Sequence, residues 1–176
     1  GMKHNPELLV RLAEHFRGNP EVRIVVNSEG LGADYLQKVK AEKELTNLVI
    51  NGYQPFERLP EVLATADVLI TILEPDAGIF SVPSKTLSYL CAGRPILGAM
   101  PTENLAAKIV SGQGAGTVVK PGDIEGFVQT AQAFHAKQAE LQTMGTNARA
   151  YAEATFSIET ITDRFEEIFK KVTSVK

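Results

Sequence analysis

The polar residues best suited to chemistry gather in one long connection. It runs from residue 74 to residue 85, between an apolar run at 68–73 and an amphipathic stretch at 84–92. Its reactive and polar side chains, with one glycine among them, are Glu74, Asp76, Gly78, Ser81, Ser84 and Lys85. Connections from a strand to a helix are usually about two to six residues long, and longer ones often bind ligands. We therefore expect a binding loop here.

The end of this connection favours an anion. Residues 84–92 are predicted to form a helix, and its first backbone N–H groups, at Ser84, Lys85 and Thr86, have no partner within the helix. Such groups and the helix dipole attract phosphate, to which Lys85 adds a positive charge and Ser84 a hydroxyl donor. The same residues also fit a plain surface helix, in which Ser81 or Ser84 caps the N-terminus and Lys85 is solvated.

Two predicted strand ends carry groups suited to sugar hydroxyls and to a nucleobase. Glu74 directly follows the apolar run at 68–73, where its carboxylate can accept hydrogen bonds from sugar hydroxyls. Gly52 and Tyr53 follow the run at 48–50 and leave room for a nucleobase, either stacked or read at its edge by backbone groups. Each position also suits an ordinary turn, so these roles remain hypotheses.

The elements that position these residues alternate along the chain. Strands are predicted at 22–26, 48–50, 68–73, 95–97 and 116–119, and helices at 6–16, 33–45, 58–66, 84–92 and 104–110. From residue 123 onward the chain is predicted to be helical, with breaks near Lys137 and at Phe156–Ser157. Apolar strands that alternate with helices are typical of an α/β, Rossmann-like doubly wound parallel sheet, here with a C-terminal helical tail.

The first predicted element is a helix, whereas a domain of this kind normally begins with a strand. Either a short strand lies within the first five residues, or the sequence was cut from a longer protein just after its first strand. Gly1 before Met2 resembles a scar left by the removal of a tag. We expect residues 1–176 to form a single domain that is a fragment of a larger protein.

Composition narrows the classes of function. The chain has 176 residues, 44% of them hydrophobic, and a formal net charge of −3, which gives no reason to expect nucleic acid as a partner. No Cys/His cluster has metal-ligand spacing, and no apolar run approaches the roughly 20 residues of a membrane span. The single cysteine, Cys91, is predicted to face the sheet together with Leu87 and Leu90. A reducing, cytoplasmic location is expected, with peripheral attachment to the inner membrane open for a parent protein.

Several strings of residues together carry a family resemblance. They are NLVINGY at 47–53, LPEVLATADV at 59–68, PSKTLSYLCAGRPIL at 83–97, GQGAG at 112–116 and VKPGD at 119–123, with further matches between 144 and 157. In this order they resemble the C-terminal donor-binding domain of GT-B glycosyltransferases of the group 1, retaining type. The sequence is most similar to the branch that builds bacterial surface polysaccharides.

The resemblance implies a role for each candidate residue. Donor binding would fall to Gly52, Tyr53, Gln54, Gly78, Ser81, Ser84, Lys85 and Ser88. The first three would hold the base, and the four between 78 and 85 would lie against the diphosphate. Glu74 matches the first acid of the family's paired-glutamate motif and would act in catalysis by contacting the transferred sugar. Ser88 stands where the family usually has the second glutamate, which holds the ribose.

The implied activity is sugar transfer from a nucleoside diphosphate sugar, such as a UDP-sugar, to a glycan, lipid or polysaccharide acceptor. No cofactor or metal is implied, because there is no Asp-x-Asp motif and Lys85 at a helix N-terminus can replace a cation. The acceptor would bind to an N-terminal domain that this sequence lacks, so the isolated chain is not expected to complete transfer. Two alternatives stay open: a stand-alone α/β binding or regulatory module, and a non-transferring GT-B relative such as a nucleotide-sugar epimerase.

Overall fold

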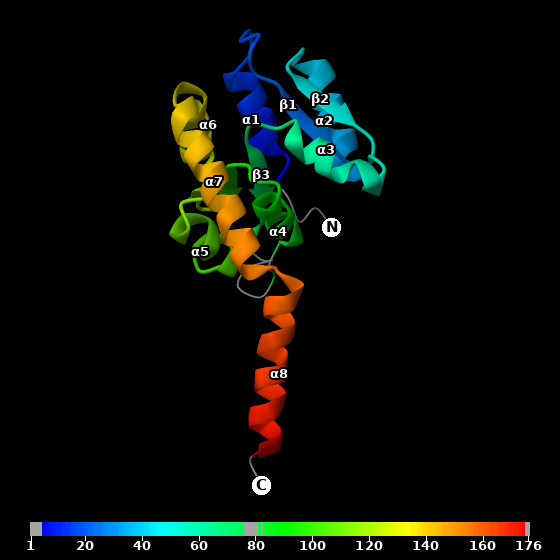
Figure 1. Ribbon diagram of the computed structural model, residues 1–176. Helices are drawn as coiled ribbons and strands as arrows, with labels where there is room; N and C mark the ends of the chain where they lie inside the picture. Colours follow the sequence, from blue (N-terminus) through cyan, green and yellow to red (C-terminus); the bar gives the residue numbers. More distant parts are fainter. Residues whose placement is uncertain (1–4, 76–80, 82, 175–176) are drawn as a thin grey trace.

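The structure is a computed structural model that describes residues 5–75, 81 and 83–174 (Figure 1). The strands are β1 (Ile24–Asn27), β2 (Leu48–Asn51), β3 (Leu69–Ile72), β4 (Ile96–Ala99) and β5 (Gly116–Val119). The helices are α1 (Glu7–His15), α2 (Leu31–Glu42), α3 (Leu59–Ala64), α4 (Ser84–Cys91), α5 (Leu105–Gly112), α6 (Ile124–Ala136), α7 (Gln138–Thr155) and α8 (Ile158–Ser174), with a 3-10 turn at Phe56–Arg58. The predicted strands and helices are confirmed, including the breaks that separate α6, α7 and α8.

The strands form two parallel groups. β1 pairs with β2, with Ile24 opposite Leu48, and β4 lies between β3 and β5, with Leu69 opposite Ile96. The parallel arrangement is as predicted, but among the described residues the hydrogen-bonded ladder does not continue from β1 to β3. In the order common to doubly wound domains, one further strand lies between two such groups. The strand sought before residue 6 falls largely on residues 1–4, which lie outside the described residues.

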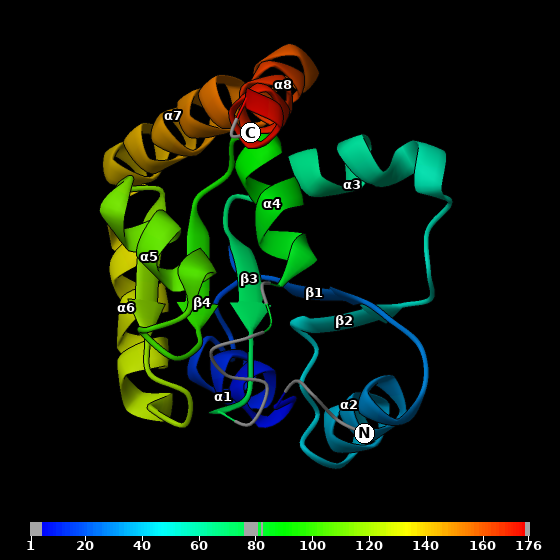
Figure 2. The same ribbon diagram turned by 90° about the horizontal axis from the view of Figure 1, so that it is seen from below.

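A single apolar core lies beneath both groups of strands. It joins residues of α1, α2 and α6 to residues of β1, β2 and β4, among them Leu8, Leu12, Ile24, Leu36, Leu48, Leu97 and Phe127. A second core on the other face of β4 and β5 is formed by Leu90, Ile96, Val110, Ala115, Ala148 and Ala152. Helices α1, α2 and α6 thus pack in the first core, while α4, α5 and α7 contribute to the second, and Figure 2 shows α1 and α4 on opposite sides of the strands.

Helix α4 turns a narrower apolar side to the sheet than the sequence predicts. Thr86 and Leu90, four residues apart and therefore on one side of the helix, are both fully buried. Leu87 is 37% exposed and Cys91 is exposed, so the prediction that Cys91 lies in the core is wrong. The buried side includes Thr86, and a search for apolar residues at helical spacing does not count a threonine.

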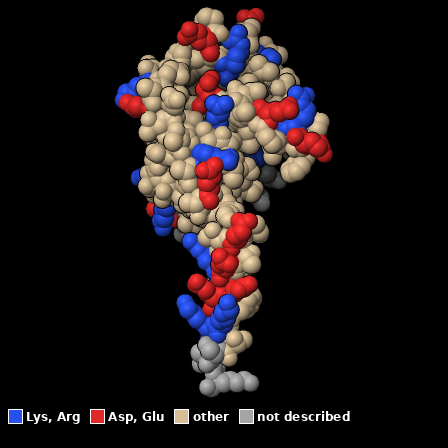
Figure 3. Space-filling view, in the orientation of Figure 1, with Lys and Arg blue, Asp and Glu red and all other residues tan. Residues whose placement is uncertain are grey.

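Helix α8 extends away from the rest of the molecule (Figure 1). Its exposed large apolar side chains are Ile158, Phe165, Ile168, Phe169 and Val172. Acidic and basic side chains lie along the same helix, beside an uncharged strip of surface (Figure 3). Within the part of the chain that the structure describes, no helix has the length and apolar character needed to cross a membrane.

Candidate nucleotide-sugar site

The predicted site residues follow the carboxyl ends of β2 and β3. Within each group of parallel strands these ends share one edge, which is where ligands bind in open α/β sheets. At the edge of the first group, Asn27 ends β1 and Asn51 ends β2, directly opposite each other. The Nδ2 of Asn51 donates a hydrogen bond of 3.0 Å to the Oδ1 of Asn27. The side-chain pair therefore adds a hydrogen bond between the last residues of the two strands, where both following loops start.

The loop after β2 is held by its neighbour after β1. The N–H of Tyr53 donates to Oε1 of Glu29 at 3.1 Å, and the Nε2 of Gln54 donates to the Gly52 carbonyl oxygen at 3.1 Å. A Cβ on Gly52 would come 3.0 Å from the same Glu29 oxygen, so a glycine here leaves room for that carboxylate. The ring of Tyr53 is 69% exposed. The loop thus presents an aromatic face on a fixed backbone.

The connection after β3 begins from a buried residue. Leu73 packs in the core, and Glu74 beside it is half-buried. Ser81 is exposed, but its carbonyl oxygen accepts a hydrogen bond of 2.8 Å from the Nδ2 of Asn104. Gly78 lies outside the described residues, so its expected contact with the diphosphate stays a prediction.

Asn104 is a supporting residue that the sequence analysis missed. It is fully buried and caps α5, because its Oδ1 accepts a hydrogen bond of 2.9 Å from the N–H of Ala106. One side-chain amide therefore holds both the start of α5 and the connection at Ser81. An asparagine directly before a predicted helix is typical of an N-cap, which was the available signal. Its contact with Ser81 could not be predicted, because that contact depends on how the chain folds.

The start of α4 offers several donors to a ligand. Ser84 and Lys85 are exposed, and Lys85 takes part in none of the ion pairs between described residues. Thr86 is fully buried, and its Oγ1 has no hydrogen-bond partner among the described residues. Ser88, one turn further along, is half-buried. The arrangement combines the exposed residue Ser84, the cation of Lys85 and the buried hydroxyl of Thr86, and within the described part of the chain Lys85 has no ion pair and the Thr86 hydroxyl has no hydrogen-bond partner.

The structure therefore assembles two parts of the predicted site separately. Gly52, Tyr53 and Gln54 form one loop, and Ser84, Lys85 and Ser88 lie on one helix. No hydrogen bond or ion pair between described residues joins these two parts.

On helix α4, burial raises the pKa of the Tyr89 phenol, which keeps the phenol neutral further into the alkaline range. Metal ligands do not gather in groups of three or more His, Cys, Asp or Glu anywhere in the described ranges.

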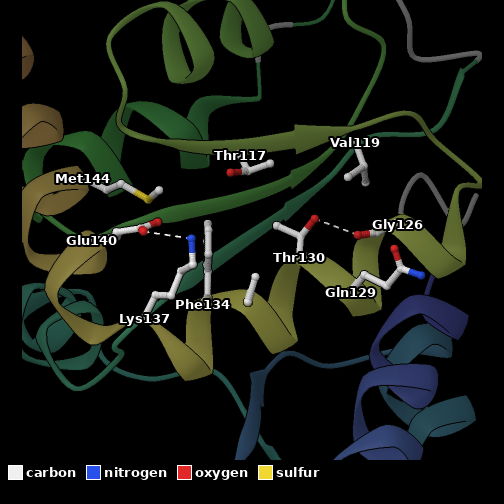
Figure 4. Close-up of a pocket in the computed structure, with 10 residues that line it drawn as sticks. Thr117, Val119, Gly126, Gln129, Thr130, Phe134, Lys137, Glu140 and Met144 are labelled. Carbon is white, nitrogen blue, oxygen red and sulfur yellow. Dashed lines mark hydrogen bonds and ion pairs between the residues drawn. The ribbon is translucent and has the colours of Figure 1, made fainter.

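Two pockets lie away from these residues. One of about 400 Å³ lies between β5, α6 and α7, where Phe134 projects toward Thr117 and Lys137 pairs with Glu140 at 2.9 Å (Figure 4). Another of about 880 Å³ lies between the end of α4 and α7, beside Gly93. No predicted site residue lines either pocket. Residues 76–80, which include the predicted site residue Gly78, lie outside the described residues.

Comparison with known proteins gives relatives in structure alone. No protein-family model and no curated protein sequence matches the chain. HepE from Anabaena, solved with UDP, is similar with a TM-score of 0.79 and 17% identity over 96% of this chain and 45% of that chain. Sucrose-phosphate synthase from Thermosynechococcus elongatus is similar with a TM-score of 0.76 and 16% identity over 100% of this chain and 44% of that chain.

A third solved structure has a chain of more similar length. The catalytic domain of cholesterol-alpha-glucosyltransferase from Helicobacter pylori gives a TM-score of 0.71 and 11% identity over 88% of this chain and 92% of that chain. By contrast, the chain spans less than half the length of the HepE and sucrose-phosphate synthase chains. These likenesses show the fold alone, which is a Rossmann-like parallel α/β arrangement with C-terminal helices, as in one half of the GT-B fold.

Proposed function

We propose that this chain is the donor-binding domain of a longer glycosyltransferase of the group 1, retaining GT-B type. The observation that carries the proposal is the start of α4, where Lys85 is exposed without an ion pair and the buried Thr86 hydroxyl lacks a partner among the described residues. The reaction is transfer of a sugar from a nucleoside diphosphate sugar to an acceptor. The family resemblance favours a bacterial surface polysaccharide as the product.

The diphosphate is the part of the donor that α4 fits best. Backbone N–H groups of Ser84 and Lys85 and the positive end of the helix dipole face an anion at this position. As the bond between the sugar and the diphosphate breaks, negative charge grows on the leaving group. Lys85 stabilises that charge electrostatically. In this proposal the positive charge comes from the protein's own side chain and helix, so no metal is assigned.

The remaining parts of the donor are assigned to the neighbouring residues. Glu74, half-buried at the end of β3, accepts hydrogen bonds from hydroxyls of the transferred sugar and orients it. Tyr53 and Gln54 hold the base, and Ser88 donates a hydroxyl toward the ribose. HepE was solved with UDP and with UDP-glucose, and pneumococcal GtfA with UDP and GlcNAc. Those complexes support a nucleoside diphosphate sugar as the class of ligand.

A binding titration tests the proposal. Calorimetry or ligand-observed NMR with UDP, GDP and ADP is compared with the matching nucleosides, which lack the diphosphate. We expect one diphosphate to bind clearly more tightly than its nucleoside, and its nucleotide sugar to compete for the same site. If none of the three diphosphates binds at millimolar concentration, or if each binds no better than its nucleoside, the proposed function is wrong.

A further inference from the structure

Glu29 has no role in the proposed function, yet it reaches the loop assigned to the base. It lies between β1 and α2, and its Oε1 accepts the Tyr53 N–H at 3.1 Å. The same oxygen would be 3.0 Å from a Cβ on Gly52. Glu29 is exposed, and no ion pair within the described part of the chain neutralises it. An uncompensated carboxylate therefore lies against the backbone of the base loop.

Exposed apolar side chains lie in the same two segments. Tyr53 is 69% exposed and Phe56 is 82% exposed, both in the connection after β2, and Leu31 at the start of α2 is 77% exposed. Of these side chains, the two aromatic ones are the best suited to a ligand that carries a flat ring. Flat aromatic rings in particular stack on nucleobases of any kind. Stacking can hold a base here, but the choice between bases requires hydrogen bonds.

The carboxylate of Glu29 can discriminate between nucleobases. It accepts hydrogen bonds and donates none. Guanine presents two neighbouring donors on one edge, N1–H and the N2 amino group, which match the two oxygens of a carboxylate. Uracil instead presents one N–H between two carbonyl oxygens, and adenine an amino group beside an acceptor nitrogen. A carboxylate repels those acceptors, so guanine fits best.

The existing contact with Tyr53 is compatible with this binding mode. A carboxylate has about four lone-pair sites, so Glu29 can accept from Tyr53 and from a base at the same time. The Tyr53 N–H, already engaged, is then not offered to a carbonyl oxygen of uracil. We infer that Glu29 sets the base preference of this site and that the donor is a guanosine diphosphate sugar. This inference rests on the proposed function and deepens it.

The test compares GDP with UDP on the chain and its variants by calorimetry. We expect the unaltered chain to bind GDP about tenfold more tightly than UDP, a typical effect of hydrogen bonds to a charged group. Glu29→Gln replaces an acceptor oxygen by a donor and should reduce that ratio to near one. Glu29→Lys, which offers only donors, should reverse it. Glu42→Gln, an exposed carboxylate at the far end of α2, should leave the ratio unchanged.

The outcomes separate this inference from the function on which it rests. If a nucleoside diphosphate binds better than its nucleoside but the unaltered chain prefers UDP, or if both Glu29 variants keep the GDP-to-UDP ratio of the unaltered chain, the role of Glu29 is overturned and the donor-binding function stands. If none of GDP, UDP and ADP binds, both are overturned, whereas binding of ADP alone overturns only the role of Glu29. Thermal unfolding of each variant is measured alongside, because a change in the ratio counts only for a folded chain.

Discussion

The backbone of Gly145 in α7 lies directly against that of Gly93, which follows α4. A Cβ on Gly145 would come 2.5 Å from the Gly93 carbonyl oxygen, and one on Gly93, where φ is 63°, would come 3.2 Å from Cβ of Arg149. The Nη1 of Arg149 donates to the Cys91 carbonyl oxygen at 2.7 Å. The C-terminal end of α4 is therefore fastened to α7, which fixes the direction in which its N-terminal end points.

This close approach predicts that Gly145→Ala is destabilising. The added methyl group must displace the backbone of either α4 or α7, and overpacking of this kind costs about 1–3 kcal/mol. The matched control is Gly112→Ala in α5, where nothing lies within 4 Å of the added Cβ. That change should be neutral or stabilising by up to about 1 kcal/mol. Denaturant unfolding measures both, and equal effects of the two changes would contradict the packing described.

Lys85 should matter for ligand binding and not for folding. Because its side chain is exposed and has no ion pair in the described part of the structure, Lys85→Ala should leave the free energy of unfolding within about 0.5 kcal/mol. Binding of a nucleoside diphosphate should weaken by about 1–3 kcal/mol, since a charge-assisted contact is lost. Calorimetry measures the loss, with Lys38→Ala in α2 as control. An unchanged affinity would remove Lys85 from the site.

The contacts of the Asn104 side chain with Ala106 and with Ser81 can be separated by substitution. Asn104→Ser keeps a side-chain oxygen that can cap α5 but removes the amide that donates to Ser81, whereas Asn104→Ala removes both. We expect Asn104→Ala to lower the free energy of unfolding by about 1–3 kcal/mol and Asn104→Ser by less. Both should weaken nucleotide binding. If Asn104→Ser binds as tightly as the unaltered chain, its contact with Ser81 does not support the site.

Stability should fall on acidification partly through Glu14. A hydrogen bond of 2.6 Å from Lys43 holds the pKa of Glu14 below its ordinary value of 4.5, and burial opposes this only in part. A carboxyl whose pKa is lower in the folded state stabilises the fold above its ordinary pKa, and that stability is lost as the pH falls through the folded value. Lys43→Met should therefore flatten the dependence of unfolding free energy on pH below about 4.5.

A control variant distinguishes this pair from other surface ion pairs. Lys38 and Glu42 are 3.8 Å apart and both well exposed, so Lys38→Met should change the acid dependence little. Denaturant unfolding between pH 3 and pH 6, roughly one unit or more on either side of the ordinary glutamate value, covers the transition. The pair is without importance for stability if Lys43→Met and Lys38→Met give the same curve.

Local patterns were sufficient to predict the secondary structure. The apolar runs at β1 to β5 and the periodic stretches between them gave the order of elements. Asp123 and Asn104 cap the helices that follow them, as such residues commonly do. The prediction for Cys91 was wrong because this residue lies at the edge of the apolar side of α4. Neighbouring positions around a helix differ in exposure there. The division between β1 and β3 depends on strand pairing, which local patterns do not encode.

The positions of the candidate residues at the strand ends were predictable and the contacts that support them were not, while their binding of a donor stays a prediction. Gly52, Tyr53, Glu74, Ser84 and Lys85 stand where a parallel sheet binds ligands, so their positions followed from the fold class. The contacts of Glu29 with Tyr53 and of Asn104 with Ser81 join residues 24 and 23 positions apart. Such contacts depend on how loops from different strands meet, so only the folded structure reveals them.

The boundary between the two groups of described strands has a mechanical consequence. Sliding one hydrogen-bonded strand past another breaks a row of bonds at once, whereas side chains packed across a boundary can shift in small steps. Between β1 and β3 the described structure has only the second kind of connection, through the core around α1. The loop after β2 and the start of α4 lie on opposite sides of this seam. A ligand that contacted both the loop after β2 and the start of α4 would therefore fix the distance between these two parts of the molecule.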